Sequence, residues 1–259
     1  MTAAHNQPLL QVSGLAMRFG GLLAVDGVKL SVMAREVFAI IGPNGAGKTT
    51  VFNCISGFYA PSAGEIALQG CSIARQPSHM VARQGLVRTF QNIRLFKMLS
   101  VVENFLVAQH NALNTNLLAG LFKLPSFRRA EQQALDRAAY WLDQLGLTAL
   151  ANRAAGTLPY GLQRRLEIAR CMMTRPRLLL LDEPAAGLNP QEKQELQLLI
   201  HTLRREHDVA VLLIEHDMSL VMGISDRILV MEHGKPIVTG TPDQVRQDER
   251  VIKAYLGEQ

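Results

Sequence analysis

The sequence lacks any apolar run long enough to cross a membrane as a helix. Such a helix needs about 20 consecutive apolar residues, and the longest core-like stretches, residues 178–181 and 209–214, are far shorter. The first ten residues, MTAAHNQPLL, also lack the basic start and the apolar centre of a secretory signal peptide. These two absences predict a chain that neither spans a bilayer nor is secreted.

Cysteine is scarce, and its spacing suits no cross-link. The three cysteines, Cys54, Cys71 and Cys171, are odd in number and far apart in the sequence. This argues against a disulfide framework and against a zinc site. We therefore expect a reducing compartment and three thiols without a function of their own.

Apolar residues, by contrast, are abundant enough for a substantial core. They make up 48% of the 259 residues, which excludes a disordered chain, and the length allows one large domain or two small ones. Lys and Arg number 27 and Asp and Glu 22, so the net charge is +5. That charge suits phosphate ligands, an anionic membrane face or nucleic acid, but it fits an ordinary solvated surface equally well. Charge alone identifies no function.

Strand-like segments dominate both ends of the chain, and amphipathic helices alternate with them in the second half. Apolar strands in this alternation imply a parallel sheet that is covered on both faces. We expect helices at residues 48–56 and 162–173 and a third that begins with Asn189 and Pro190. The strands that we expect are residues 9–19, 22–32, 36–41, 65–69, 87–90, 178–181, 209–214, 227–231 and 236–239.

A mostly helical stretch, residues 91–158, interrupts this alternation. Leu135, Ala138, Leu142 and Leu145 keep the spacing of one buried helix face. We therefore interpret the stretch as an inserted subdomain, and we expect residues 120–125, which turn residues bound, to form its mobile loop.

A phosphate-binding loop is the strongest functional signal. Residues 42–49, GPNGAGKT, match the pattern G-x-x-x-x-G-K-S/T. They lie between an expected strand and an expected helix, where a phosphate-binding loop has to be. Glycines let backbone N–H groups turn onto phosphate oxygens, and the helix N-terminus adds a positive dipole end. Lys48 would reach the β and γ phosphates, and Thr49 would be a ligand of Mg²⁺. The residues that we expect to bind the nucleotide are Gly42, Pro43, Asn44, Gly45, Ala46, Gly47, Lys48, Thr49 and Thr50.

Two carboxylates follow the apolar strand at residues 178–181. Asp182 and Glu183 would stand at the carboxyl end of a parallel strand, which is the edge where such sheets bind ligands. We expect Asp182 to take Mg²⁺ through water, and Glu183 to polarise the attacking water. Asp-Glu after an apolar run is commonly a solvated turn, so this interpretation depends on the phosphate loop.

Three further residues gain a role beside this pair. His216 ends the strand at 209–214 and could meet the γ-phosphate, and Gln91 could reach Mg²⁺ or the attacking water. Phe19 could stack on adenine, although a lone aromatic is also a common core residue. The catalytic candidates are thus Glu183, His216 and Gln91, and the metal candidates are Thr49, Gln91 and Asp182.

The order of these motifs resembles the ATP-binding cassette (ABC) ATPases over essentially the whole chain, including a helical insertion between a glutamine and a signature helix. The resemblance extends to the LivG-type ATP-binding subunits of branched-chain amino acid importers. It is carried by the stretches RFGGLLAV (18–25), SFRRA (126–130), RRLEIAR (164–170), DEPAAGLNP (182–190), IEHDM (214–218), VMGISDR (221–227) and AYLG (254–257).

This resemblance implies an α/β P-loop NTPase fold of the ABC type, with an N-terminal antiparallel β subdomain and an inserted α-helical subdomain. It implies one domain over residues 8–257. Within it, residues 1–90 and 165–240 would form the ATP-binding core and β subdomain, 91–164 the helical subdomain and 241–259 a C-terminal helical tail.

The same resemblance implies the partners and the location. Two cassettes would sandwich two ATP molecules with Mg²⁺, on the cytoplasmic face of the inner membrane. A second, similar ATPase, two permease subunits and indirectly a periplasmic binding protein would complete the importer, and no nucleic acid would be bound. The candidate permease surface is the helical insertion together with residues 91–100.

The signature segment departs from the general pattern L-S-G-G-Q. In the sandwich it would bind the partner's nucleotide, in trans, yet Pro159 has neither a hydroxyl nor an N–H to offer a phosphate. We therefore expect two unequal composite sites, the weaker completed by this segment. Its residues are Leu158, Pro159, Tyr160, Gly161, Leu162 and Gln163.

Alternative functions remain at this point. The cargo could be urea, another amino acid or a lipid, because cargo does not touch this chain. A soluble ABC protein acting on DNA or ribosomes would normally carry two cassettes or a long coiled coil, and neither is present. A P-loop kinase or GTPase would leave the signature helix unexplained, and the sequence has no N-K-x-D guanine motif.

Overall fold

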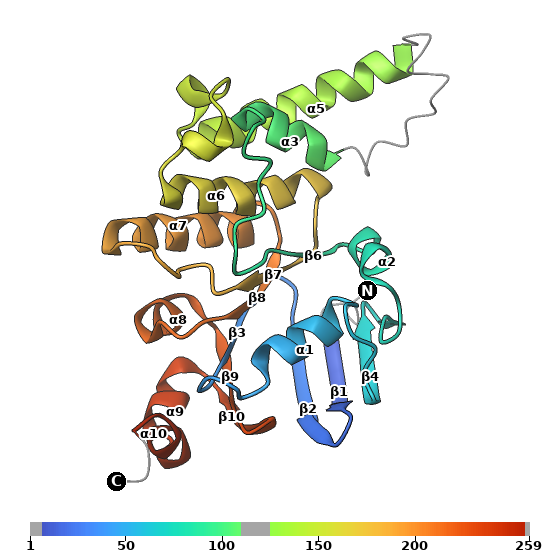
Figure 1. The fold of residues 1–259 in the computed structure, drawn as a ribbon, viewed down its shortest axis with the longest axis vertical. Helices are drawn as coiled ribbons and strands as arrows, with labels where there is room; N and C mark the ends of the chain where they lie inside the picture. Colours follow the sequence, from blue (N-terminus) through green and yellow to red (C-terminus); the bar gives the residue numbers. More distant parts are fainter. Residues whose placement is uncertain (1–6, 110–124, 257–259) are drawn as a thin grey trace, which may run out of the picture. The chain divides into compact units, whose positions relative to one another are not determined.

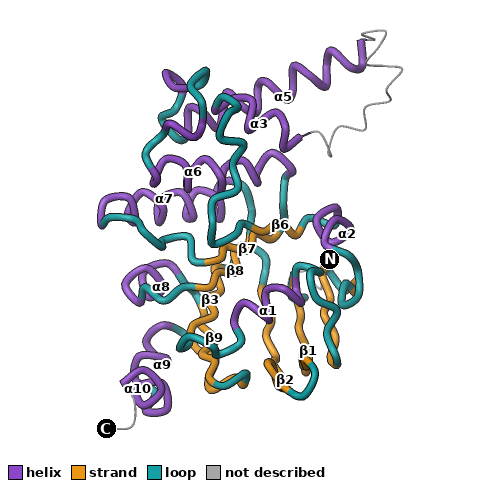
Figure 2. The backbone as a smooth tube through the Cα atoms, in the orientation of Figure 1, coloured by secondary structure: helices purple, strands orange, loops and turns teal. Residues whose placement is uncertain are grey.

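The computed structural model describes residues 7–109 and 125–256. The chain divides into two compact units, which we call the sheet unit (residues 1–91 and 176–259) and the helical unit (residues 92–175). Figure 1 traces the course of the chain, and Figure 2 shows that the strands belong to the sheet unit. No helix in the described ranges combines the length and the apolar character that crossing a bilayer requires.

The sheet unit begins with an antiparallel sheet. Its strands lie in the order β2-β1-β4-β5, and β1 pairs with β2 on one side and with β4 on the other. This confirms the antiparallel β subdomain that the sequence predicted. The bounds are β1 Leu10–Phe19, β2 Leu22–Val32, β4 Ala63–Leu68 and β5 Cys71–Ser72.

A second sheet of six strands carries the apolar runs. Its order is β10-β9-β3-β8-β7-β6, with β10 antiparallel to β9 and every other neighbouring pair parallel. Every residue of β3, β7 and β8 is buried, as expected for strands that are covered on both faces. The bounds are β3 Val37–Ile41, β6 Leu86–Arg88, β7 Leu178–Asp182, β8 Ala210–Ile214, β9 Arg227–Glu232 and β10 Lys235–Gly240.

The helices of the sheet unit begin at the signals that the sequence carries. In α7, the Asn189 side chain accepts from the backbone N–H of Glu192, and Pro190 occupies the first turn, which confirms the expected helix start. The Asp217 side chain caps α8 in the same way. The bounds are α1 Lys48–Ile55, α2 Ser78–Arg83, α7 Pro190–Glu206, α8 Met218–Ile224, α9 Pro242–Gln247 and α10 Glu249–Leu256.

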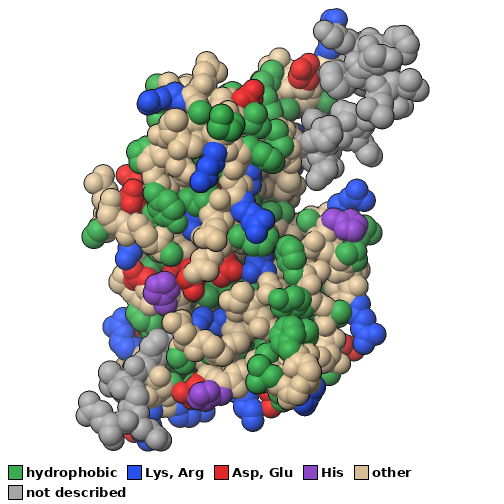
Figure 3. All heavy atoms as spheres, in the orientation of Figure 1, with side chains coloured by type: hydrophobic (Ala, Val, Ile, Leu, Met, Phe, Trp, Pro, Cys, Tyr) green, Lys and Arg blue, Asp and Glu red, His purple; other side chains and the backbone are tan. Residues whose placement is uncertain are grey.

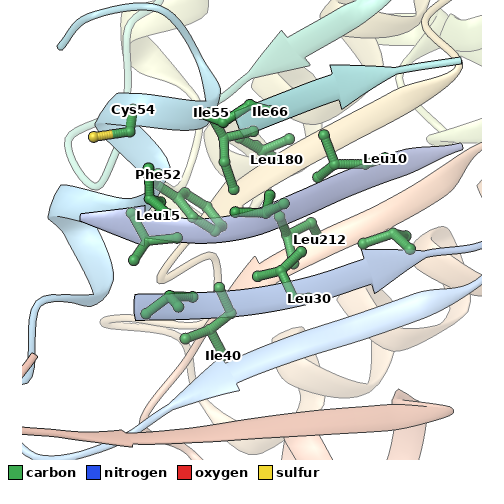
Figure 4. Close-up of a cluster of buried hydrophobic side chains, with 14 of the residues drawn as sticks. Leu10, Leu15, Leu30, Ile40, Phe52, Cys54, Ile55, Ile66, Leu180 and Leu212 are labelled. Carbon is green, nitrogen blue, oxygen red and sulfur yellow. The ribbon is translucent and has the colours of Figure 1, made fainter. Parts of the chain in front are cut away.

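One apolar cluster joins both sheets to α1. Figure 4 shows Phe52 and Ile55 of α1 pointing among side chains that come from the antiparallel sheet and from the six-stranded sheet. Because these side chains are fully buried, they fix the helix that follows the phosphate loop to the two sheets. The other labelled members are Leu10, Leu15, Leu30, Ile40, Cys54, Ile66, Leu180 and Leu212.

The helical unit holds three α-helices in its described part. The bounds are α3 Val101–Gln109, α5 Pro125–Gln144 and α6 Tyr160–Cys171, with short 3₁₀ turns at Thr148–Leu150, Ala155–Thr157 and Met172–Thr174. Residues 120–124 of the expected mobile loop lie outside the described residues. The subdomain boundaries that we expected stay predictions.

Two local predictions were wrong. Leu135 does not lie on the buried face of α5, because the buried stripe runs through Ala134, Ala138 and Trp141 and Leu135 falls at its edge, 40% exposed. The strand before Gln91 ends at Arg88 rather than at Phe90. Gln91 therefore stands in a loop three residues beyond the strand.

Candidate functional site

The phosphate-binding loop joins β3 to α1, and two of its glycines, Gly42 and Gly47, are required by close packing. A Cβ atom added to Gly42 would lie 2.1 Å from the carbonyl oxygen of Met231, and one added to Gly47 would lie 2.7 Å from that of Ala24. Gly47 also has a φ of +89°, a left-handed conformation that favours glycine, and it directly precedes Lys48 at the start of α1. The loop is thus packed tightly around the helix N-terminus.

Lys48 bridges this loop. Its Nζ donates hydrogen bonds to the carbonyl oxygens of Gly42 at 2.7 Å and Pro43 at 2.9 Å. Burial lowers the pKa of Lys48, while the charges of Glu183 and Asp182 act in the opposite direction. The ammonium group is therefore held across the loop with two carboxylates near it.

A cavity of about 430 Å³ opens over the loop. It holds Lys48, Thr49, Thr50 and Glu183, so it brings the phosphate loop and the expected catalytic carboxylate together. Sequence reasoning missed several of its lining residues, which come from β2 and from the turn between β9 and β10. These are Leu22, Leu23, Ala24, His233 and Gly234.

The turn between β9 and β10 is hydrogen-bonded to the phosphate-binding loop. The Gly234 N–H donates to the carbonyl oxygen of Ala46 at 3.2 Å, and the Gly234 carbonyl accepts from the Asp26 N–H at 2.8 Å. His233, the residue before it, has a φ of +46°, which is uncommon outside glycine. The only sequence signal for this turn is the His-Gly pair between the two expected strands at 227–231 and 236–239.

Asp182 and Glu183 lie where the sequence predicted, at the carboxyl end of β7. Asp182 is the last strand residue and is buried. Glu183 adopts a left-handed φ of +47°, and its N–H donates to the carbonyl oxygen of Ile214 in β8 at 2.9 Å. A non-glycine residue in this conformation persists only when its surroundings impose it, and such strain is frequent at functional sites.

The three catalytic candidates meet at one oxygen atom. Gln91 Nε2 donates to Glu183 Oε2 at 2.9 Å, and His216 Nδ1 lies 3.8 Å from the same oxygen. These residues come from three different points of the chain, just beyond the ends of β6, β7 and β8. Because neighbouring parallel strands end at one edge of the sheet, the topology brings them together.

A further carboxylate, missed by sequence reasoning, ties two of these segments. Glu215 is fully buried and accepts from the backbone N–H groups of Ala185 at 2.7 Å, His216 at 3.1 Å and Asp217 at 3.4 Å. Burial raises the pKa of Glu215, and these hydrogen bonds act against the shift. The carboxylate thus connects the loop after Glu183 to the loop of His216.

Phe19 lies apart from this cavity. It ends β1, is 41% exposed and packs edge-to-face on Tyr59, with ring centroids 5.4 Å apart. Among the described residues, those that line the cavity do not include Phe19. Its contact with adenine stays a prediction.

The signature segment belongs to the helical unit. Pro159 is the N-cap of α6, and its side chain makes no capping hydrogen bond. Leu158 is buried, Tyr160 is exposed, and Gln163 Nε2 donates back to the Leu158 carbonyl oxygen at 2.8 Å. The segment therefore presents the phenol of Tyr160 and the ring of Pro159 at its helix N-terminus, without a hydroxyl at the capping position.

The donor set fits Mg²⁺ held together with phosphates. No cluster of three or more His, Cys, Asp or Glu side chains suited to a metal occurs in the described part of the chain. The oxygens at hand, the Thr49 hydroxyl and the Asp182 carboxylate, are hard donors. Mg²⁺ usually binds through one or two protein groups, with substrate phosphates and water as its other ligands, which matches this sparse set.

Charges of both signs are interspersed on the surface drawn in Figure 3. Basic and acidic side chains alternate there with apolar ones, and no basic field covers that face. A nucleic-acid-binding surface would gather Lys and Arg on one face or stripe. The face drawn shows no such gathering, and the expectation that no nucleic acid is bound stays a prediction.

Two family models match the chain. Residues 25–186 match the family described as ABC transporter, and residues 235–259 match the family described as branched-chain amino acid ATP-binding cassette transporter. The second match covers β10, α9 and α10, for which the residues alone suggested no role.

Curated relatives match over nearly the full length. The chain is 64% identical over 253 residues to the high-affinity branched-chain amino acid transport ATP-binding protein BraF of Pseudomonas aeruginosa, with 98% of this chain and 99% of the relative covered. It is 60% identical, with the same coverage, to the protein LivG of the same description from Escherichia coli.

Solved structures share the fold. The chain is similar to the ADP conformation of an ATP-binding cassette of an ABC transporter, with a TM-score of 0.84 and 31% identity. The match covers 98% of this chain and 100% of that one. The fold class predicted from the sequence is thereby confirmed.

Proposed function

The chain belongs to the ABC transporter family, among the branched-chain amino acid transport ATP-binding proteins, and on that premise we propose that it hydrolyses ATP to power the uptake of leucine, isoleucine and valine. One observation carries the proposal for the chemistry. The carboxylate of Glu183 lines the phosphate-loop cavity while Gln91 and His216 both approach its Oε2 atom.

Nucleotide binding is the task of the loop and Lys48. The N–H groups at the start of α1 offer donors and a positive dipole end to the phosphates of ATP. Lys48 donates two of its three N–H bonds to carbonyl oxygens of its own loop, which hold the side chain in place and leave the third N–H for a phosphate, so little side-chain freedom is lost on binding. Leu22 and Leu23 line the cavity with apolar surface, and Phe19 supplies the aromatic face for the base.

Hydrolysis requires a base that holds and orients a water molecule. Glu183 is suited to this role, because its backbone is tied to β8 and its carboxylate is oriented by the amide of Gln91. His216 stands beside the same carboxylate, where it would contact the γ-phosphate. General-base catalysis of this kind contributes roughly 10²–10⁴-fold to the rate.

Mg²⁺ would be held by Thr49, Asp182 and Gln91 together with the phosphates. When bound, the ion neutralises part of the charge that develops on the phosphate oxygens. Buried Asp182 would contribute its carboxylate at the end of β7, and Gln91 would contribute an amide oxygen.

The proposed assembly is an importer. Two cassettes would close on ATP, each completing the partner's site with its signature segment, from Leu158 to Gln163. Permease subunits would dock on the insertion and on residues 91–100, which places the chain on the cytoplasmic face of the membrane. Because Pro159, the N-cap of α6, makes no side-chain capping hydrogen bond, we keep the proposal that the site completed by this segment is the weaker one.

A pair of substitutions tests the chemistry. Glu183→Gln should keep ATP binding and lower hydrolysis roughly 10²–10⁴-fold, because the amide cannot accept the proton. Lys48→Ala should instead abolish ATP binding, measured with a fluorescent ATP analogue. Normal hydrolysis by Glu183→Gln would show that another residue orients the water, and retained binding by Lys48→Ala would remove the phosphate loop from its role.

The cargo is tested through the partners. Mass spectrometry of the complex purified from native membranes in mild detergent should find a second cassette ATPase and two distinct permeases. The binding protein of that system should then bind leucine, isoleucine or valine. A binding protein that prefers urea or a lipid would show that the transporter carries another cargo. Purification of the chain without any membrane protein would contradict the proposed importer.

A further inference from the structure

The side chain of Arg88, at the end of β6, is buried and pairs with the carboxylate that we assign to Mg²⁺. Its Nη2 donates to Asp182 Oδ2 at 2.7 Å, and only 5% of the Arg88 side chain and 9% of the Asp182 side chain are exposed. β6 and β7 are parallel neighbours, with Arg88 in register with Leu180. The ion pair therefore joins two residues that are 94 positions apart in the sequence.

The rest of the guanidinium group is equally constrained. Nη1 donates to Asn53 Oδ1 at 2.7 Å and to Ser56 Oγ at 3.0 Å, both at the end of α1. Arginine suits such a site, because its planar fork serves several acceptors at once. Three rings also surround the guanidinium carbon, with centroids 5.3–5.8 Å away: Phe52, Phe58 and Phe90.

Fold stability alone does not explain this arrangement. A buried ion pair is weak evidence for stability, because removing two charges from water costs about as much as their attraction returns. Nε of Arg88 is also buried without a hydrogen-bond partner among the described residues. A buried guanidinium with an unmet donor costs stability, so its position is better explained by what it does to its neighbours.

The position of Arg88 determines how the carboxylate of Asp182 is oriented. With Oδ2 bound to Arg88, Oδ1 is the carboxylate oxygen left for a ligand. We propose that Arg88 is a positioning residue that holds Asp182 in the orientation needed to bind Mg²⁺ and links that orientation to the end of α1. The inference rests on the proposed function, since it presupposes a nucleotide site with a divalent ion.

Arg88→Lys is the sharpest test, because it keeps the positive charge and removes the fork. A lysine ammonium cannot reach Asp182, Asn53 and Ser56 in the same geometry. The matched control is Arg227→Lys, since Arg227 also packs over a ring, Phe38, at 5.2 Å. That arginine pairs with Glu36 at 3.3 Å in the same unit, and its other side-chain contacts in the described part of the chain are with the Ser31 carbonyl oxygen and Phe38, which are not site residues.

Two affinities are measured on the full-length chain. The first is that of a fluorescent ATP analogue in EDTA, and the second is that of Mn²⁺ for the chain with ATP, followed by electron paramagnetic resonance. Arg88→Lys should weaken Mn²⁺ binding about tenfold and leave the metal-free nucleotide affinity within about twofold of the unmodified chain. Arg227→Lys should change neither, although both variants lower the urea midpoint.

The outcomes separate the two proposals. Unchanged Mn²⁺ affinity in Arg88→Lys, or equal losses with and without metal, would overturn the positioning role and leave the nucleotide site intact. An unmodified chain that binds no nucleotide in EDTA would instead contradict the proposed function. Should Arg88→Lys fail to fold, Asn53→Ala tests the same role. It removes one acceptor of the guanidinium and should weaken Mn²⁺ binding two- to threefold, and no change there would likewise overturn the role.

Discussion

Each of the two units buries one arginine against a carboxylate, but the two pairs are built differently. In the sheet unit, Arg88 reaches Asp182 from a neighbouring strand, across 94 positions of sequence. In the helical unit, Arg164 pairs with Glu167 at 2.9 Å within one turn of α6, and their side chains are 0% and 2% exposed. One pair depends on tertiary structure, whereas the other is local.

The surroundings of the two carboxylates differ as well. Asp182 ends a strand at the edge of a ligand cavity, while Glu167 uses its second oxygen to accept from the backbone N–H of Arg94 at 2.7 Å. Burial raises the pKa of Glu167, against the lowering effects of that hydrogen bond and of Arg164. Two buried ion pairs thus differ in what surrounds them: we propose that one orients a functional carboxylate, while the other fastens a loop to a helix.

We rank three carboxylate replacements, Glu167→Ala, Asp217→Ala and Asp208→Asn, by their expected loss in the free energy of unfolding. Glu167→Ala should be the most destabilising. It removes the carboxylate that pairs with the buried guanidinium of Arg164, and losses of about 3–5 kcal/mol in the free energy of unfolding are usual when one partner of a buried pair is removed. Urea denaturation at pH 7 measures it. The paired replacement Arg164→Met with Glu167→Leu removes both charges and should recover more than half of the loss. A loss under about 1 kcal/mol for Glu167→Ala would contradict the importance of the pair.

Asp217→Ala should cost less, about 1–2 kcal/mol, because its pair with Lys193 is partly exposed and the remainder is an N-cap. Asp217→Asn is the control, since asparagine caps as well as aspartate but carries no charge, and it should lose under about 1 kcal/mol.

The contribution of the Asp217 carboxylate to the free energy of unfolding should also depend on pH. The hydrogen bond from Lys193 holds the pKa of Asp217 well below its usual value of 3.8. A lowered pKa stabilises the fold above the unfolded-state pKa, and this contribution is lost as the pH falls through the folded-state pKa. The difference between the unmodified chain and Asp217→Asn, measured by urea denaturation, should therefore be constant near pH 7 and shrink below about pH 4. A difference that grows on acidification would contradict the assignment.

What the sequence predicts well is local. The phosphate loop could be recognised because its glycines, Lys48 and Thr49 are contiguous and their spacing is dictated by one strand, one turn and one helix. Glu183 and His216 could be placed at one edge because parallel strands end together. The family resemblance, which covers the whole chain, predicted the fold class and the membership that the comparisons confirm.

What the sequence did not predict depends on register and on long-range packing. Arg88 lies over Asp182 because β6 and β7 align as they do, and no spacing between the two residues encodes that alignment. Glu215 was a visible signal, a carboxylate directly after an apolar strand, but its acceptance of the Ala185 N–H requires the fold of a distant loop. His233 likewise lines the cavity only because the fold brings the β9–β10 turn next to the phosphate-binding loop.

Asp208→Asn should have the smallest effect of the three replacements. Asp208 pairs with Arg35, but their side chains are 65% and 61% exposed, so water and salt screen the attraction. Asparagine tolerates the left-handed φ of +58° at this position, which removes backbone strain as a second cause. We expect a loss under about 0.5 kcal/mol by urea denaturation, shrinking further in about 1 M salt. A loss that matches Glu167→Ala would show that burial does not rank these pairs, and the contrast between local and long-range pairs would then need another physical basis.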